Sequence, residues 1–199
     1  MRTKKTILVT LQALLLIIMS ILSSCGQKYD DESDFRVSII NDGKAVMITR
    51  YVGNKQTVRI PAKINGLPVT RIADEAFEEK NLYNVIIPNG VLTIGEGAFW
   101  GNKLSSVTIP NSVTSLGDAA FYDNDLTSVI IPNNIGRIGI MAFYENPLTQ
   151  ITIGADVDLV GEMYLRPAGW DEKGFYQFYV DNNKQAGSYV YQDQVWIKR

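Results

Sequence analysis

The sequence predicts a β-rich solenoid built from a unit of 22 residues, with a different segment at each end. Three observations lead to this fold class. Apolar residues recur at a fixed spacing, one half of each unit alternates apolar and polar residues, and turn-forming residues separate the halves. Repeats of this length are typical of solenoids, in which each unit buries its apolar face only by stacking on its neighbours.

The repeat is kept in several registers over four units, which span residues 67–154. The most regular registers are Phe77, Phe99, Phe121 and Phe143; Ala76, Ala98, Ala120 and Ala142; and Leu82, Leu104, Leu126 and Leu148. Three further apolar registers keep the same step through Ile72, Val85 and Ile87. Because about three stacked units suffice for a stable array, four units are enough to fold.

Each unit divides into two halves. The stretch Leu104–Pro110 alternates apolar and polar residues, which predicts a short strand with Val107 and Ile109 pointing inward and a proline at its end. The stretch Val113–Phe121 turns at a glycine and buries alanine and phenylalanine, as a turn or a short helix. Asparagines that recur in later units, at 102, 124 and 146, are expected to hydrogen-bond turn backbone between coils.

The segments beside the repeats are predicted to cap the solenoid, since an open end exposes apolar side chains and strand edges. Residues 35–66 form the N-terminal cap, which begins with a hairpin around Asn41-Asp42-Gly43. Residues 155–199 form a C-terminal β cap with three short aromatic strands, at 175–179, 186–191 and 195–197.

The pattern Ile-Pro-Asn-x-Val-Thr-x-Ile-Gly-x-x-Ala-Phe, nearly literal in Ile109–Phe121, resembles the BspA-type leucine-rich repeat of bacterial surface proteins. The stretch Val58–Val69 resembles the opening unit of such proteins, with a five-residue insertion. The resemblance implies a leucine-rich-repeat solenoid, α/β or mainly β, that binds a protein partner. It also favours the sheet face for that contact.

The N-terminus resembles a bacterial lipoprotein export signal. A basic start is followed by the apolar run Ile7–Leu22, which at 16 residues is shorter than the roughly 20 that a spanning helix needs. The sequence Leu22-Ser23-Ser24-Cys25 then resembles a lipobox. This resemblance implies that residues 1–24 are a removed signal peptide and that Cys25 carries the lipid. Residues 25–34, polar and acidic, are expected to be a flexible tether.

The expected location is therefore a bacterial membrane. The residue after the cysteine is Gly26. Under the enteric sorting rule, an aspartate at that position would keep a lipoprotein at the inner membrane. Resemblance to that rule favours the outer membrane and the cell surface. The periplasmic face is the alternative.

Composition argues against catalysis. The chain has no histidine and a single cysteine, so neither a Ser–His nor a Cys–His arrangement is available. A pair of carboxylates could hydrolyse glycosides, but no spacing singles one out. We expect that the protein is not an enzyme and that it has no cofactor and no metal site.

The net charge argues against nucleic acid as a partner. The formal charge is −2, and it becomes −5 without residues 1–24, which hold three basic residues and no acid. Phosphate binding requires a basic face instead.

Three surface stripes follow from the period. The first is aromatic: Trp100, Tyr122 and Tyr144. It suits sugar faces or protein hot spots, although half-buried rings that pack between coils would give the same pattern. The second, Asp74, Glu96 and Asp118, is expected to be a solvated rim rather than a calcium site.

The third stripe is the outward face of the strands, and its candidate contact residues are Ile86, Thr108, Ile130 and Thr152. Four strands about 4.8 Å apart and about 16 Å long give roughly 300 Å². A standard footprint is about 800 Å² per partner. A protein partner is therefore expected to touch the rims or the caps as well.

The leading hypothesis is a lipid-anchored surface protein that contacts a protein, such as a host or matrix protein, as an adhesin or antigen. The alternatives are a glycan-binding module that uses the aromatic stripe and a periplasmic scaffold with an endogenous partner.

Overall fold

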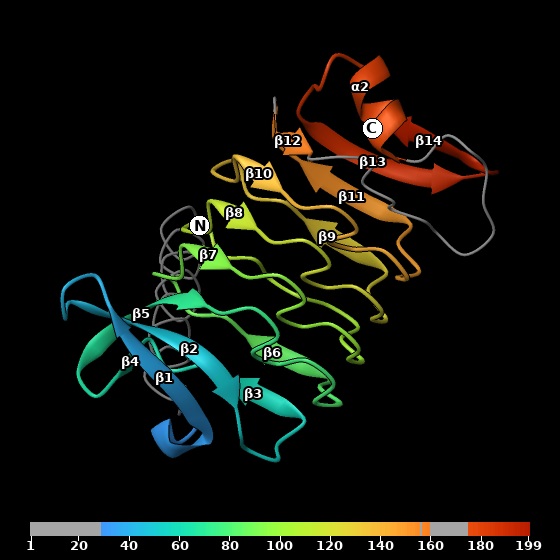
Figure 1. The fold of residues 1–199 in the computed structure, drawn as a ribbon. Helices are drawn as coiled ribbons and strands as arrows, with labels where there is room; N and C mark the ends of the chain where they lie inside the picture. Colours follow the sequence, from blue (N-terminus) through green and yellow to red (C-terminus); the bar gives the residue numbers. More distant parts are fainter. Residues whose placement is uncertain (1–28, 156, 160–174) are drawn as a thin grey trace, which may run out of the picture.

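The computed structural model describes residues 29–155, 157–159 and 175–199 (Figure 1). The predicted signal peptide of residues 1–24 and the candidate lipidation site Cys25 lie outside these residues. The described part forms a solenoid whose coils stack from the N-terminal hairpin to the C-terminal hairpin.

The first sheet of the solenoid takes one short strand from each coil. Its order is β1-β2-β5-β7-β8-β10-β12, with β4 paired to β5. The strands are β1 (Phe35–Ile40), β2 (Ala45–Tyr51), β4 (Lys63–Ile64), β5 (Leu67–Ile72), β7 (Thr93–Ile94), β8 (Ser115–Leu116), β10 (Arg137–Ile138) and β12 (Asp158–Leu159). From β2 to β12 the neighbours are parallel. Of these, β7, β8 and β10 come from the half of the unit for which the sequence predicted a turn or short helix, whereas β1 and β2 are the strands of the predicted hairpin.

The strands that the alternating pattern predicted, with strands of the two caps, form two smaller sheets, and we call these two together the second sheet. Its members are β3 (Thr57–Arg59), β6 (Asn84–Ile86), β9 (Ser128–Ile130), β11 (Gln150–Ile153), β13 (Gly187–Gln192) and β14 (Val195–Lys198). They are paired as β3-β6 and as β14-β13-β11-β9. Between these groups, the strand expected over Leu104–Pro110 is reduced to one bridge, from Thr108 to Ile86. Ile109 is buried there as predicted, but Val107 is only half-buried.

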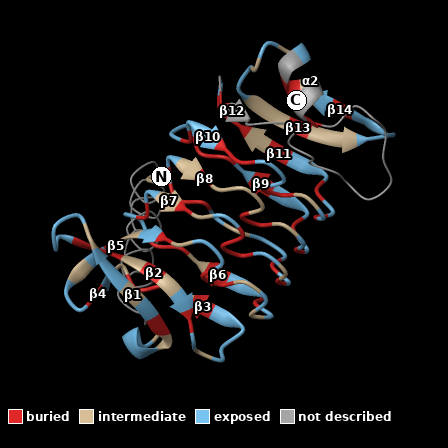
Figure 2. Ribbon diagram, in the orientation of Figure 1, coloured by how far each residue is buried: buried red, intermediate tan, exposed pale blue. Residues whose placement is uncertain are grey.

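Buried residues fill the space between the two sheets (Figure 2). A ladder of stacked rings runs through this core. The ring centroids of Phe77 and Phe99 are 5.0 Å apart, those of Phe99 and Phe121 are 5.1 Å apart, and those of Phe121 and Phe143 are 5.5 Å apart. Tyr51 of the N-terminal cap continues the ladder at 5.4 Å from Phe77. The phenylalanine register therefore forms one continuous column.

A second ladder joins the coils through the buried asparagines. The Asn124 side chain accepts a hydrogen bond from the backbone N–H of Leu104 at 3.1 Å and donates to the carbonyl of Phe99 at 2.9 Å, both in the preceding coil. Asn102 and Asn146 make the same contacts with their own preceding coils. The predicted role of these asparagines is confirmed. Each one satisfies backbone groups that would otherwise be buried without partners.

The N-terminal hairpin forms as predicted, with β1 antiparallel to β2 and positive φ angles at Asn41, Asp42 and Gly43. The end of the expected tether is held in place, however. The short helix η1 (Glu32–Asp34) precedes β1, and Asp30 accepts from the backbone N–H of Arg59 at 2.8 Å and forms an ion pair with Lys55 at 2.7 Å. Acidic side chains of this segment accept hydrogen bonds from donors on the first coil. Residues 30–34 therefore belong to the folded cap.

The C-terminal cap corrects one prediction. The aromatic segment expected as a strand at 175–179 is the helix α2 (Phe175–Asp181), while β13 and β14 form the other two predicted strands. Aromatic residues at 175, 178 and 179 fit the i, i+3, i+4 spacing of a helix face. Phe175 and Tyr179 are buried, and the Tyr179 hydroxyl donates to the carbonyl of Gly154 at 2.6 Å. Contact with the last coil thus favours the helix over the strand.

The repeated glycines set a steric test of the coil spacing. A Cβ at Gly117 would overlap the backbone of Gly95 and Glu96 in the preceding coil, whereas a Cβ at Gly136 would meet nothing closer than the Thr114 carbonyl at 3.9 Å. We expect Gly117→Ala to lower the free energy of unfolding by about 3 kcal/mol, because overpacking of this kind forces backbone to move. Gly136→Ala should raise that free energy by up to about 1 kcal/mol. Urea unfolding of both variants measures the difference, and equal effects would contradict the proposed spacing constraint.

Candidate functional site

The aromatic stripe forms a ladder on the surface. We call Trp100, Tyr122 and Tyr144 the aromatic ladder. Ring centroids of Trp100 and Tyr122 lie 5.5 Å apart at 88°, and those of Tyr122 and Tyr144 lie 5.5 Å apart at 20°. Trp100 is 40% exposed and the two tyrosines are half-buried. The ladder therefore combines packing between coils with an accessible outer edge, most of it at Trp100.

Negatively charged side chains lie near Tyr122 of the aromatic ladder. The pKa of the Tyr122 phenol is raised from its ordinary value of 10.0, first by burial and then by the charges of Glu145, Tyr144 and Asp123. Another exposed ring, Tyr83, has the Lys103 ammonium 5.8 Å from its centroid. The period did not reveal Tyr83, because the equivalent positions in later units hold serine and threonine.

The predicted contact residues on the strands are neighbours in two pairs. We call Ile86, Thr108, Ile130 and Thr152 the strand face. Ile86 bridges Thr108, and Ile130 is the register partner of Thr152. Ile130 is 67% exposed, while Ile86 and Thr152 are half-buried. The structure extends this face beyond the repeats, because β13 and β14 continue the sheet next to β11.

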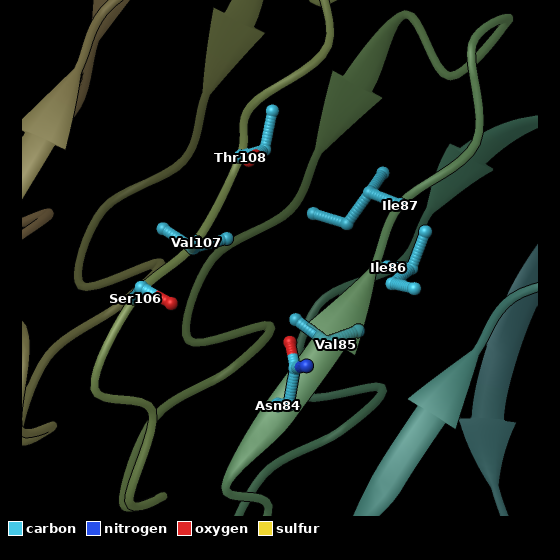
Figure 3. Close-up of a pocket in the computed structure, with 7 residues that line it drawn as sticks. All are labelled: Asn84, Val85, Ile86, Ile87, Ser106, Val107 and Thr108. Carbon is cyan, nitrogen blue, oxygen red and sulfur yellow. The ribbon is translucent and has the colours of Figure 1, made fainter. Parts of the chain in front are cut away.

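A shallow pocket opens in the strand face, with a volume of about 440 Å³. Its walls come from two neighbouring coils, Asn84–Ile87 and Ser106–Thr108 (Figure 3). It lies where the predicted strand of the second coil is reduced to a bridge. The lining mixes aliphatic groups with an amide and two hydroxyls, as small binding pockets often do.

The acidic stripe has a structural role. The carboxylate of Asp74 accepts a hydrogen bond from the backbone N–H of Glu96 at 2.8 Å, and that of Asp118 accepts from Ile140 at 2.9 Å. Each aspartate thus joins its coil to the next. Across the described ranges, no group of three or more acidic, histidine or cysteine side chains is placed to hold a metal ion.

Sequence reasoning missed the outer face of the first sheet. Arg71, Thr93, Ser115 and Arg137 line a groove of about 540 Å³ there, and the Arg71 side chain donates to the Thr93 hydroxyl at 3.2 Å. The signal was available, since these residues share one register of the repeat just before the buried Ile72, Ile94, Leu116 and Ile138. It was overlooked because no strand was expected in that half of the unit.

Two sheets of short parallel strands, joined by buried phenylalanine and asparagine ladders at a period of 22 residues, define a leucine-rich-repeat solenoid. The chain belongs to the BspA-type leucine-rich-repeat family, whose model matches residues 55–166 in six copies, more than half of the chain. The six copies include the opening unit and run past the four repeats found in the sequence. The family consists of repeat proteins that commonly serve as protein-interaction modules, rather than of enzymes.

Several solved structures are similar to part of the chain. A T. pallidum leucine-rich-repeat protein is 24% identical, with a TM-score of 0.48 over 59% of this chain and 67% of that one. A Bacteroides capillosus leucine-rich-repeat protein is 23% identical, with a TM-score of 0.49 over 61% of this chain and 95% of that one. A Bacteroides ovatus protein of the same kind is 23% identical, with a TM-score of 0.40 over 59% and 38%. No curated protein matches the chain.

None of the helices in the described residues has the length and apolar character needed to cross a bilayer.

The negative charges near Tyr122 predict how the stability of the chain depends on pH. Because the pKa of Tyr122 is raised in the folded chain, its contribution to stability is complete below pH 10.0 and is lost as the pH rises through the raised value. We expect the double change Asp123→Asn and Glu145→Gln to lower this pKa, since it removes two nearby negative charges. The phenolate absorbance that Tyr122→Phe removes reports the titration. Glu96→Gln, in the acidic stripe, serves as the control, and an equal shift of the Tyr122 pKa in that variant would contradict the assignment.

Proposed function

We propose that this protein is a lipid-anchored surface protein of a bacterium that binds a protein partner through the aromatic ladder and the strand face. The observation that carries the proposal is the contrast between two aromatic registers of the same coils. The phenylalanine register is fully buried, whereas the adjacent register holds Trp100 40% exposed beside Tyr122 and Tyr144. Accessible tryptophan and tyrosine are the residues most enriched at binding hot spots.

The size of the surface supports a contact that extends past the four repeats. The strand face of the repeats alone gives roughly 300 Å², well below the footprint of about 800 Å² that a stable partner needs. The described cap strands β13 and β14 enlarge the same sheet. We expect the partner to touch the ladder, the strand face and this cap together.

Membrane attachment rests on the sequence around Cys25, the only cysteine in the chain. A lipid on this residue would leave the whole repeat array outside the bilayer. Several acyl chains are needed for stable anchoring, because one chain binds only marginally. The lipobox-like sequence Leu22-Ser23-Ser24-Cys25 supports this arrangement.

Protease treatment of intact cells tests the location. We expect added protease to remove residues 35–199 from intact cells, while a known periplasmic protein stays whole until the cells are lysed. In the same cells, labelling with a radioactive fatty acid should mark the wild-type protein and not Cys25→Ser. Protection of the solenoid until lysis would instead give it a periplasmic partner and remove the adhesin role.

Glycan binding is the second candidate, favoured by the exposure of Trp100 on an aromatic ladder. If the ladder binds sugars, the wild-type chain should bind at least one class of oligosaccharide on a glycan array. The triple change Trp100→Ala, Tyr122→Ala and Tyr144→Ala should then abolish that binding. Tyr83→Ala, which removes an exposed ring outside the ladder, should leave it intact. Unchanged binding by the triple variant excludes this role.

A further inference from the structure

Charge is divided unequally between the N-terminal cap and the coils. Residues 35–71 contain seven basic residues and one acid, a net charge of +6, whereas residues 72–155 contain three basic residues and nine acids, a net charge of −6. The four acids at 30, 31, 32 and 34 reduce the charge of residues 29–71 to +2. The chain is thus polarised, with a basic end next to the N-terminal segment.

Three of the four acids of the N-terminal segment are already engaged within the chain. Asp30 pairs with Lys55, the Asp31 carboxylate accepts from the backbone of Ser33, and Glu32 accepts from the backbone of Asn65 at 2.7 Å. They neutralise the side of the cap where the segment docks. The basic residues elsewhere on the cap stay uncompensated.

The basic residues on the hairpin oppose one another. Arg36 of β1 and Arg50 of β2 are direct register partners, and both are exposed. Like charges opposite each other destabilise a strand pair. Within the described part of the chain, neither arginine has an ion pair, and the same holds for the exposed Lys44 in the hairpin turn. An external anion would relieve this repulsion.

Exposed apolar side chains accompany these charges. Ile39 of β1 is 66% exposed, and Val52, directly after β2, is 44% exposed. Basic residues close to an anionic bilayer surface are attracted to its headgroups.

The chain length fixes how far this cap can be from Cys25. Because Asp30 is held on the first coil, Cys25 is only five residue steps away from a fixed point of the fold. Fully extended, they span at most about 17 Å. A lipid on Cys25 would therefore keep the cap beside the membrane, while β13, β14 and α2 lie at the opposite end of the solenoid (Figure 1).

We propose that the N-terminal cap docks on anionic phospholipid headgroups through Arg36, Lys44 and Arg50, and so orients the solenoid with its C-terminal cap away from the bilayer. The orientation rests on the lipid anchor proposed above, but the headgroup contact does not. Each basic residue near an anionic surface strengthens binding by roughly fivefold.

Vesicle sedimentation tests the contact without acylation. The probe protein is the chain of residues 25–199 with Cys25→Ser, and the vesicles contain either phosphatidylcholine alone or phosphatidylcholine mixed with phosphatidylglycerol. We expect binding to the mixed vesicles only, and weaker binding at high salt. The triple variant R36E/K44E/R50E should bind them more than about a hundredfold more weakly. The neutralised variant R36Q/K44Q/R50Q should fall between it and the unchanged chain, which keeps the result independent of any folding defect from reversal.

The matched control is K80E/K103E/R137E, which changes the net charge equally but on the coils. Its affinity should stay within a few-fold of the unchanged chain. Equal losses in the two triple variants, or no preference for phosphatidylglycerol, would overturn the proposal. Binding of the cap to dextran sulfate but not to vesicles would assign it to a soluble polyanion and would also overturn it. Because the assay uses no lipid anchor, its failure is distinguishable from failure of fatty-acid labelling at Cys25.

Discussion

Stacking of identical coils about 5 Å apart is the constraint on which the rest of this structure depends. The phenylalanine rings repeat at 5.0–5.5 Å along the axis, and in the first sheet the strand of one coil pairs in register with those of the coil before and the coil after. This spacing requires glycine at position 117, because a side chain there would overlap the backbone of the previous coil. The hydrogen bonds of Asn124 depend on the same spacing, since its amide reaches backbone groups of the preceding coil only at that distance.

The regular stacking of coils also aligns residues that recur at one position of the repeat into continuous surfaces. Any outward residue that recurs at the period is placed beside its copies, so a tryptophan and two tyrosines become the aromatic ladder and two isoleucines and two threonines become the strand face. Such surfaces stay flat and open, since neighbouring coils contribute to them equally. This geometry suits contact with a large partner better than enclosure of a small substrate, in agreement with a repeat family used for protein interaction.

Much of the fold could be predicted from the sequence, and the failures have identifiable causes. The buried registers, the asparagine contacts and the N-terminal hairpin were all visible as patterns. The second strand of each coil was not, because two residues such as Thr93–Ile94 are too short to show an alternation. The helix α2 was mistaken for a strand because a short aromatic run fits both periods until its packing partner is known. The candidate residues on the strands are neighbours in two pairs, as the period implies, while the groove on the first sheet was missed together with the sheet that carries it.

The sequence by itself determined the period, and with it which side chains are buried and which align on the surface. Burial of apolar groups at a fixed spacing leaves a stacked chain no other consistent arrangement. Only the tertiary structure decided how accessible each aligned residue is and what the two ends look like. Trp100 is 40% exposed at the first position of the aromatic ladder, and the equivalent position in the preceding coil holds Glu78. Residues 30–34 and 175–181 took their conformations from contacts with the first and last coils, and contacts between residues so far apart in the chain leave no periodic trace in the sequence.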